Sequence, residues 1–383
     1  MEIEYFSKDN IHSVPWEKFI QGEYVRKYFL PFFEQGSSCI KNVKTEIGII
    51  AVENLLIPIT KNEEEFENSY VCSPYSHYVS YLKEELYLLN HHVVKQSLSA
   101  LLSGLGYMFK KGKINKIIYV NNWLLSTNLY EELTSKHIQQ IVSFLSKTFP
   151  DYTISFRSVH TFFDGQFANL FRQNKAKLIA SRSIYLQQIE EDIEKMYPKR
   201  IRKRIRQDLK ALHESGYEIV DSSSLTIENS ERIVELYNML YVSKYSSYNP
   251  QFTESFINNA RENQLLTFFA LQKEGKIDGV IGYFKRNGML TTPILGYDTS
   301  LPKETGLYRL CTILLYLQAK KEKVMIHRSS GVGDFKKNRG AEKHLEYNAV
   351  FYRHLSFHRR IPWYIVSFLA NRCAAPLLRK YDF

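Results

Sequence analysis

The sequence predicts a mixed α/β protein of two domains, each with a central sheet flanked by helices. The chain has 383 residues, which is more than one ordinary domain needs and enough for two domains with separate cores. Its 44% hydrophobic content, with 17 Gly and 11 Pro, is typical of a globular protein that folds throughout. Strand-like and helix-like segments alternate in both halves, which favours open, partly parallel sheets.

The first half has an irregular start followed by alternating elements. Glu53-Asn54 separates two apolar runs and is a good hairpin turn between two strands. Leu98, Leu101 and Leu105 recur at helical spacing. The expected elements are two strands within 44–60, a strand end within 70–79, helices at 81–89 and 92–110, a strand at 114–120, a helix at 129–148 and a strand at 152–159.

A break in the pattern near 174–183 separates this half from a long, very basic helix at 185–215. Pro198 is expected to begin a second helical segment there, because proline is favoured in the first helical turn. Ile201, Ile205, Leu209 and Leu212 follow at i, i+4, i+8 and i+11, which places them on one apolar stripe with Arg and Lys around the rest.

The remaining elements have the order of helices, an antiparallel meander, and then a strand, a helix and a strand. Asn287-Gly288 is a strong hairpin signal within the meander. The expected elements are a strand at 217–220, helices at 231–245 and 252–262, strands at 265–271, 277–285 and 289–297, a helix at 306–321, a strand at 324–328, a glycine-rich loop and a strand at 347–354.

Charge and cysteine content narrow the functional classes. The net charge of +11 favours phosphate-rich partners such as nucleic acid, coenzyme A or an anionic membrane. The four cysteines are far apart and form no cluster with histidine at metal-ligand spacing, so no metal site is expected. Residues 1–10 do not resemble a secretory signal, and no apolar stretch is long enough to span a membrane, so a cytoplasmic protein is expected.

Three segments of the second half occur in a characteristic order and spacing: PKRIRKRIRQDLKALHESGYEI, ILGYDTSLPKETGLYRLCTILLYLQAKK and GVGDFKKNRGA. In this order and spacing they resemble the GNAT superfamily, and in particular its FemABX-like, BioF2-like branch of often duplicated acyl and aminoacyl transferases. The resemblance implies tandem GNAT-like domains. We expect an N-terminal domain at 1–180, an acyltransferase domain at 181–358 and a helical tail at 359–383.

The second segment predicts a binding site for an anionic donor. A strand, a loop and an apolar helix place free backbone N–H groups and a positive dipole end at the helix start. The GNAT resemblance implies that this loop binds the coenzyme A pyrophosphate, although Tyr308 stands where the family has a small residue. A purely structural helix start is the alternative. The candidate donor-binding residues are Lys303, Thr305, Gly306, Leu307, Tyr308 and Arg309.

The loop of the third segment adds Lys336, Lys337 and Arg339, three cations between glycine-bearing turns that suit a phosphate or carboxylate. A solvated basic loop has the same pattern. Asp298 ends a strand beside the expected anion site and is the first candidate for an acid–base or amine-orienting group. His327 is the second, because its ordinary pKa suits removal of a proton from an amine.

Two further basic segments are candidates for contacts with large partners. The basic helix is a candidate tRNA-binding surface, with a solvated helix face as the alternative. Its candidate residues are Arg200, Arg202, Lys203, Arg204 and Arg206. The tail has apolar residues followed by Arg372, Arg379 and Lys380. We favour docking of the tail onto a domain over contact with an anionic membrane.

Together these features predict an N-acyltransferase that moves an acyl or aminoacyl group to an amine or hydroxylamine by direct attack. The donor is a substrate, acyl-CoA or aminoacyl-tRNA, and no permanently bound cofactor is expected. The acceptor is expected to be a small-molecule amine, and the oligomeric state stays open. The alternative is a catalytically silent GNAT-like protein that binds RNA or a protein partner.

Overall fold

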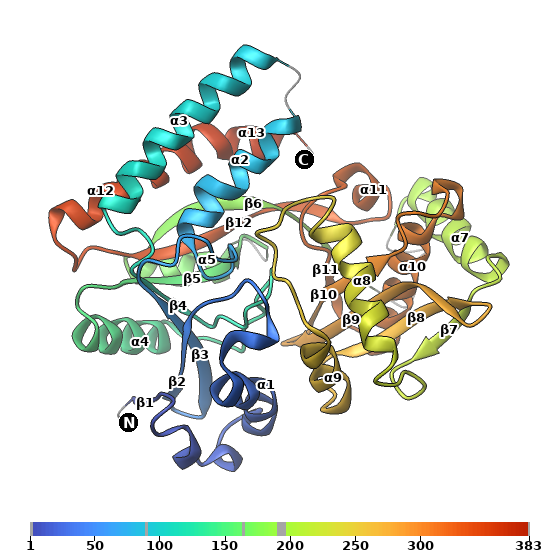
Figure 1. Cartoon of the computed structure of the whole chain (residues 1–383), viewed down its shortest axis with the longest axis horizontal. Coiled ribbons are helices and arrows are strands. Elements are labelled where there is room, and N and C mark those ends of the chain that lie inside the picture. Colours follow the sequence, from blue (N-terminus) through green and yellow to red (C-terminus); the bar gives the residue numbers. More distant parts are fainter. Residues whose placement is uncertain (1–2, 89–90, 163–164, 190–196, 382–383) are drawn as a thin grey trace.

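The structure, a computed structural model, describes residues 3–88, 91–162, 165–189 and 197–381 and is organised around one mixed sheet (Figure 1). The sheet has twelve strands in the order β1-β2-β3-β4-β5-β12-β6-β11-β10-β9-β8-β7. The strands are β1 (Glu4–Phe6), β2 (Glu46–Val52), β3 (Leu55–Asn62), β4 (Ile117–Val120), β5 (Thr153–His160), β6 (Lys177–Gln187), β7 (Glu218–Asp221), β8 (Thr267–Lys273), β9 (Lys276–Arg286), β10 (Met289–Tyr297), β11 (Met325–His327) and β12 (Glu342–Phe351).

Helices flank the sheet on both sides of its centre (Figure 1). They are α1 (Gly22–Gln35), α2 (Tyr81–Glu85), α3 (His92–Lys111), α4 (Ser135–Thr148), α5 (Gln166–Gln173), α7 (Lys199–Glu214), α8 (Asn229–Tyr241), α9 (Glu254–Glu262), α10 (Leu307–Glu322), α11 (Gly333–Lys337), α12 (Phe357–Phe368) and α13 (Ala375–Lys380). Within the described ranges, none of these helices has both the length and the apolar character needed to cross a bilayer. The predicted mixed α/β fold is confirmed.

The two halves exchange strands at the centre of the sheet. The last strand, β12, lies between β5 and β6 and is antiparallel to both, so that Glu346 is opposite His160 on one side and Arg182 on the other. In turn β6 pairs with β11 of the second half. Each half therefore has the same outward order of strands, with β6 and β12 shared between them. The predicted division at residue 180 falls inside β6, a strand that belongs to both halves.

Local patterns predicted most elements, and the errors lie where tertiary contacts override them. The bounds of β10 agree with the expected strand at 289–297. The expected strand end at 70–79 is wrong, because these residues form turns and a π-helical turn, η4 (Ser76–Ser80). The supposed break at 174–183 and the first residues of the expected basic helix instead form β6, whereas 190–196 lie outside the described residues. The irregular start contains α1.

The aromatic residues of the N-terminal region explain why that region folds. Tyr28 and Phe29 of α1 are fully buried against Trp123 of the loop after β4 and against Phe256 of α9. This cluster joins the first half to the second half, and two further hydrophobic clusters lie mainly in one half each. A 14-residue helix with Pro31 inside it has a weak local signal, and its burial is what stabilises it.

One side of the C-terminal tail docks on the sheet. Trp363 of α12 is buried and donates a hydrogen bond to Thr153 Oγ1 of β5 at 2.9 Å. Asn371, in the π-helical segment η7 (Leu369–Ala374), accepts from the N–H of Ala180 at 2.9 Å and donates to the carbonyl of Leu178 at 2.8 Å. The tail therefore pairs with backbone groups of β6 that would otherwise form an open strand edge.

Candidate functional site

The second half opens where β10 and β11 part. These parallel strands pair only from Met289–Met325 to Thr291–His327, although β10 continues to Tyr297. A bulge in β10 lies between Thr291 and Ile294, at the point where the pairing ends. A bulge leaves part of the backbone outside the ladder and redirects the strand. The two strands thus form a V with His327 at its vertex.

The helix that follows β10 begins without a side-chain cap. Gly306 occupies the N-cap position of α10 with φ of 69°, a left-handed conformation that favours glycine, and no side chain among the described residues caps the helix. The corresponding helix of the first half, α4, is closed by Thr134, which accepts from the N–H of His137 at 3.1 Å in a capping box. Only the second of these two junctions therefore keeps its N-terminal N–H groups free of a side-chain acceptor.

The residues around Gly306 differ in exposure. Lys303 is exposed, Thr305 is half-buried and Leu307 is buried. The ring of Tyr308 lies 6.1 Å from that of Tyr297 and 5.0 Å from that of Phe335, between the end of β10 and α11. The expected donor loop therefore combines an exposed cation with a half-buried aromatic wall.

The predicted donor-binding arginines share one carboxylate. Arg309 of α10 lies 2.5 Å from Asp208 Oδ1 of α7, and Arg339 donates to both oxygens of the same side chain. Asp208 is buried, so each arginine offsets the cost of its desolvation. These contacts tie α7 to α10 and to the loop after α11. They neutralise part of the positive charge that was expected to bind the donor.

Lys336 is placed differently from the prediction. Its side chain is buried, and Nζ donates to the carbonyls of Arg328 at 2.6 Å and Ser330 at 2.7 Å. Burial, together with the nearby Arg328 and Arg182, holds the pKa of Lys336 well below its usual range. This lysine fixes the loop after β11 and is not at a phosphate-binding surface. Lys337, next to it, forms an exposed ion pair with Asp334 at 3.3 Å.

Asp298 also has a structural environment. Its carboxylate accepts from Arg232 Nη2 at 2.6 Å and from Lys276 Nζ at 3.1 Å, and one oxygen accepts from the N–H of Ser300 at 3.0 Å. Burial raises the pKa of Asp298, but these hydrogen bonds outweigh it and hold the pKa well below the usual range. A carboxylate locked in this way is a poor acid or base, so the geometry argues against the predicted role of Asp298.

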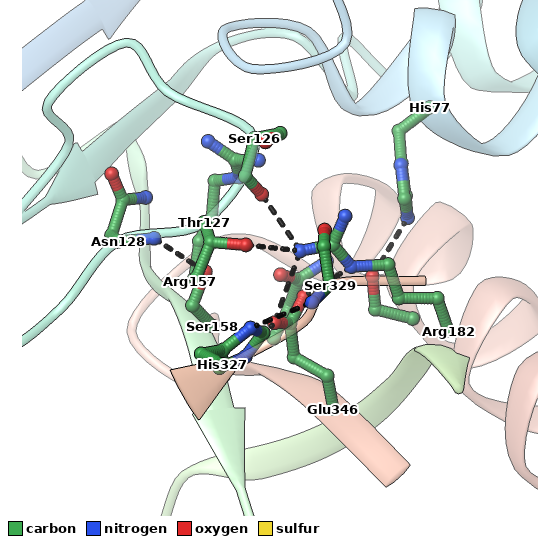
Figure 2. Close-up of polar contacts among 12 residues, drawn as sticks. His77, Ser126, Thr127, Asn128, Arg157, Ser158, Arg182, His327, Ser329 and Glu346 are labelled. Atoms are coloured by element: carbon green, nitrogen blue, oxygen red, sulfur yellow. Dashed lines mark hydrogen bonds and ion pairs between the residues drawn. The ribbon is translucent and has the colours of Figure 1, made fainter. Parts of the chain in front are cut away.

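His327 lies in a buried polar cluster where the two halves meet, as Figure 2 shows. At the centre of the cluster, Arg182 Nε of β6 donates to Glu346 Oε1 of β12 at 2.9 Å. Arg182 Nη2 donates to the carbonyl of Ser126 at 2.8 Å and to Thr127 Oγ1 at 2.9 Å, both in the loop after β4. The cluster therefore takes groups from both halves, and His327, where the pairing of β10 and β11 ends, is one of them.

The hydrogen bonds of His327 define its tautomer. Nδ1 accepts from the backbone N–H of Ser329 at 3.1 Å, so the neutral ring carries its proton on Nε2. Nε2 is buried, has no hydrogen-bond partner in the described part of the chain, and lies 3.8 Å from Glu346 Oε2. Burial, followed by the charge of Arg182, holds the pKa of His327 well below its usual range. In this state His327 offers a hydrogen-bond donor rather than the predicted general base.

Arg182 and Glu346 are the members of the site that sequence reasoning missed. Arg182 fell in the supposed break, and Glu346 immediately precedes the expected strand at 347–354. Two further residues lie in the same region: His77 of η4, whose Nε2 lies 3.2 Å from Ser181 Oγ, and Arg157 of β5, which donates to the carbonyl of Leu125 at 3.2 Å. A pair of residues 164 positions apart leaves no local signal.

The basic helix α7 forms an outer surface of the second half. Its candidate residues Arg200, Lys203, Arg204 and Arg206 are exposed, whereas Arg202 is half-buried. Arg200 donates to Asn338 at 2.8 Å, next to the α11 loop. This surface lies beside α10, because Arg309 joins the two helices through Asp208. Binding of tRNA there stays a prediction.

Several solved structures are distantly similar to this chain. L-PGS from Bacillus licheniformis is 12% identical, with a TM-score of 0.44 over 62% of this chain and 78% of that one. FemX is 9% identical, with a TM-score of 0.44 over 61% and 79%. A tandem GNAT protein from the clavulanic acid biosynthesis pathway is 8% identical, with a TM-score of 0.40 over 91% and 98%. The sequence matches no described protein family and no curated protein. The strand order of the two halves agrees with the predicted tandem GNAT-like organisation.

Proposed function

We propose that the chain is an acyl- or aminoacyltransferase whose donor binds where β10 and β11 part. The observation that carries this proposal is the succession of three features along β10 and the helix that follows it. The strand pairing ends at Thr291–His327, β10 bulges there, and α10 begins uncapped at Gly306. A helix N-terminus suits the phosphate of a donor, and an opened strand offers backbone groups to its acyl carbonyl.

The polar cluster supplies groups for the transfer step. The acceptor nitrogen attacks the donor carbonyl carbon, the new C–N bond forms, and the C–S bond of a thioester or the C–O bond of an ester breaks. The Nε2–H of His327 is free to donate to an oxygen that gains negative charge. Glu346 is held by both its oxygens on Arg182, so its role is to position the cluster and not to act as a base. The acceptor ammonium loses one proton to solvent before it attacks, and the proton released on attack leaves with the thiol or hydroxyl. Catalysis rests mainly on positioning and electrostatic stabilisation.

The donor is proposed to bind the second half and not the first. The first half has the same strand order, but the Thr134–His137 capping box occupies the N–H groups at the start of α4. His137 and Lys136 are themselves paired with Glu53, at 2.9 Å and 2.8 Å. An anionic donor would be repelled by the Glu53 carboxylate, and the capping box would compete with it for the N–H groups at the helix start.

Gly306 gives a sharp test of the donor site. Gly306→Asp places a negative charge at the start of α10, whereas Gly306→Asn has nearly the same shape and no charge. Asp and Asn both tolerate a positive φ better than other side chains, so the pair is matched for strain. We expect acyl-CoA or aminoacyl-tRNA to raise the Tm of the wild type, since a ligand at one hundred times its Kd stabilises by about 2.7 kcal/mol.

We expect the Asp variant to bind the donor at least about tenfold more weakly than the Asn variant, because like charges repel at the helix end. Product formation from candidate amines, followed by mass spectrometry, distinguishes the two donor types. Equal donor binding by the two variants would show that the donor does not bind at this junction. No response to any donor, together with RNA binding that depends on Lys203 and Arg204, would favour the alternative of a catalytically silent RNA-binding protein.

A further inference from the structure

The outer side of the C-terminal tail is a second surface that the transfer reaction does not use. Helix α12 buries Trp363 and Val366 against the sheet. The opposite side of the helix carries an apolar stripe that stays exposed, with side chains at i, i+4, i+7 and i+11. They are Phe357 (74% exposed), Ile361 (39%), Tyr364 (49%) and Phe368 (62%). Helix α12 therefore has apolar side chains on two opposite faces, one packed on the sheet and one exposed.

A basic groove borders this stripe. It has a volume of about 560 Å³, and Tyr364 and Phe368 of the stripe form part of its wall. Four cations line it: Lys177, Arg353, Arg360 and Arg372. None of these four forms an ion pair with any residue in the described ranges, and the sequence has no Asp or Glu between Glu346 and Asp382. The groove is therefore an uncompensated positive surface next to exposed aromatic rings.

Helix α3 extends the same kind of surface. Of its 20 residues only Gly106 and Phe109 are buried, and Val94, Leu101 and Met108 are exposed at intervals of seven residues. No Asp or Glu occurs from His91 to Lys116. The end of α3 is held against α12, because Arg359 donates to the carbonyl oxygens of Gly112 and Lys113. Figure 1 shows α3, α12 and α13 together at one end of the molecule.

We propose that α3 and the outer side of α12 dock on an anionic lipid bilayer, with lipid phosphates held in the groove of Lys177, Arg353, Arg360 and Arg372. An apolar stripe flanked by cations and free of acids is the pattern of a helix that lies in the membrane interface. The proposal concerns a surface separate from the V between β10 and β11 and does not depend on the transferase activity.

Charge and apolarity together select this occupant over the others. A second copy of the chain would bring the same four cations against each other in a symmetric contact. Nucleic acid would pair with the cations but would leave the exposed side chains of Ile361 and Leu101 in contact with polar phosphates and sugars. A bilayer with anionic lipids satisfies both, because its headgroups attract the cations and its acyl region accepts the apolar side chains.

Vesicle co-sedimentation with the full chain tests the proposal. We expect binding to vesicles of phosphatidylglycerol and phosphatidylcholine, and weaker binding by at least tenfold to phosphatidylcholine alone. Replacing the four groove cations with Gln should lower partitioning at least a hundredfold, since each cation near an anionic surface contributes about a fivefold factor. Replacing Phe357 and Phe368 with Gln should lower it about tenfold while keeping the charge.

Matched control variants change the same number of side chains elsewhere. Lys199, Lys203, Arg204 and Lys210 on α7 are exposed, and changing them to Gln removes four charges away from the groove. Ile219→Gln with Ile227→Gln replaces two exposed apolar residues elsewhere. We expect both controls to bind vesicles as the wild type does. Every changed residue is exposed except Arg360, which is half-buried and donates to the carbonyl of Leu355 at 2.6 Å, so Tm is measured for each variant to verify that it is folded.

Three results would overturn the proposal. The first is a wild type that does not bind the anionic vesicles, or binds them as strongly as phosphatidylcholine alone. The second is an α7 control that loses as much binding as the groove variant. The third is a dimer, by sedimentation velocity, that the Phe357→Gln, Phe368→Gln variant disrupts, because it would assign the stripe to a second copy of the chain.

Discussion

The Arg182–Glu346 pair makes a prediction about stability that follows directly from its burial. The two side chains are 18% and 4% exposed, and they join the central strands β6 and β12. Arg182→Met keeps most of the length of the side chain but removes its hydrogen bonds to Glu346, Ser126 and Thr127. Breaking a buried ion pair by removing one partner costs about 3–5 kcal/mol, because the other charge is left uncompensated.

This cost converts into a shift of the melting temperature. Unfolding entropy of about 2.1 cal/mol/K per residue gives about 0.8 kcal/mol/K for the 383-residue chain, so a loss of about 4 kcal/mol lowers the Tm by about 5 °C. The assay is differential scanning calorimetry at neutral pH. Glu23→Gln is the control, because it breaks an ion pair with Arg26 whose side chains are 55% and 39% exposed, and exposed pairs contribute only about 0–1 kcal/mol.

The double variant Arg182→Met, Glu346→Leu should recover most of the lost stability, since well-packed apolar residues often replace a buried pair without cost. Two results would refute the reasoning. One is an Arg182→Met shift no larger than that of Glu23→Gln. The other is a double variant that is less stable than Arg182→Met, because the penalty would then not come from the unpaired carboxylate.

Three further predictions concern the rest of the fold. Burial lowers the pKa of His77 to about 3 and of His160 to about 4, from 6.5. The unfolded chain therefore binds more protons than the folded chain below pH 6.5. Each histidine should lower the free energy of unfolding by up to about 1.4 kcal/mol per pH unit as the pH falls toward those values. His160→Gln should therefore make the fall of Tm between pH 6.5 and 5 less steep, and an unchanged slope would contradict this. Asn371→Ala removes both hydrogen bonds to the edge of β6 and should lower the free energy of unfolding by about 1–3 kcal/mol. Light scattering should then detect new aggregation. Arg372→Ala, at an exposed site, is the control and should change the Tm by less than about 1 °C. Among the four cysteines only Cys373 is exposed, so a thiol reagent should label one site on the folded chain and none after Cys373→Ser; rapid labelling of a second thiol would show that a buried cysteine is accessible.

Much of the fold could be predicted from the sequence where the signal is local. The hairpin at Asn287-Gly288, the stripe Ile205–Leu212 of α7 and the bounds of β10 depend on residues only a few positions apart. The strand β6 could not be predicted in this way, because its residues alternate poorly and its stability comes from pairing with β12, which is 155 or more residues later in the chain. Helix α1 was missed for the same reason, since it forms by burying Tyr28 and Phe29 against both halves.

The candidate site divides along the same line. Gly306 and the start of α10 were found because a strand, a glycine and an apolar helix occur in succession. The roles of the charged residues could not be predicted, because the sequence does not specify their partners. Asp298 and Lys336 had suitable residue types in suitable places, but Arg232 and the carbonyls after β11 hold them.

The sequence by itself determined the uncapped junction at Gly306 and the order of the elements in the second half, apart from α11, which lies where a loop was expected. Both follow from short-range backbone sterics and hydrogen bonding. Only the tertiary structure decided that β6 and β12 are shared between the halves. It also decided that Arg182, Glu346 and His327 meet beside the opening of β10 and β11. The physical reason is that strand pairing and the pairing of buried charges join residues far apart in the chain, and the free energy of those contacts depends on burial, which no local pattern specifies.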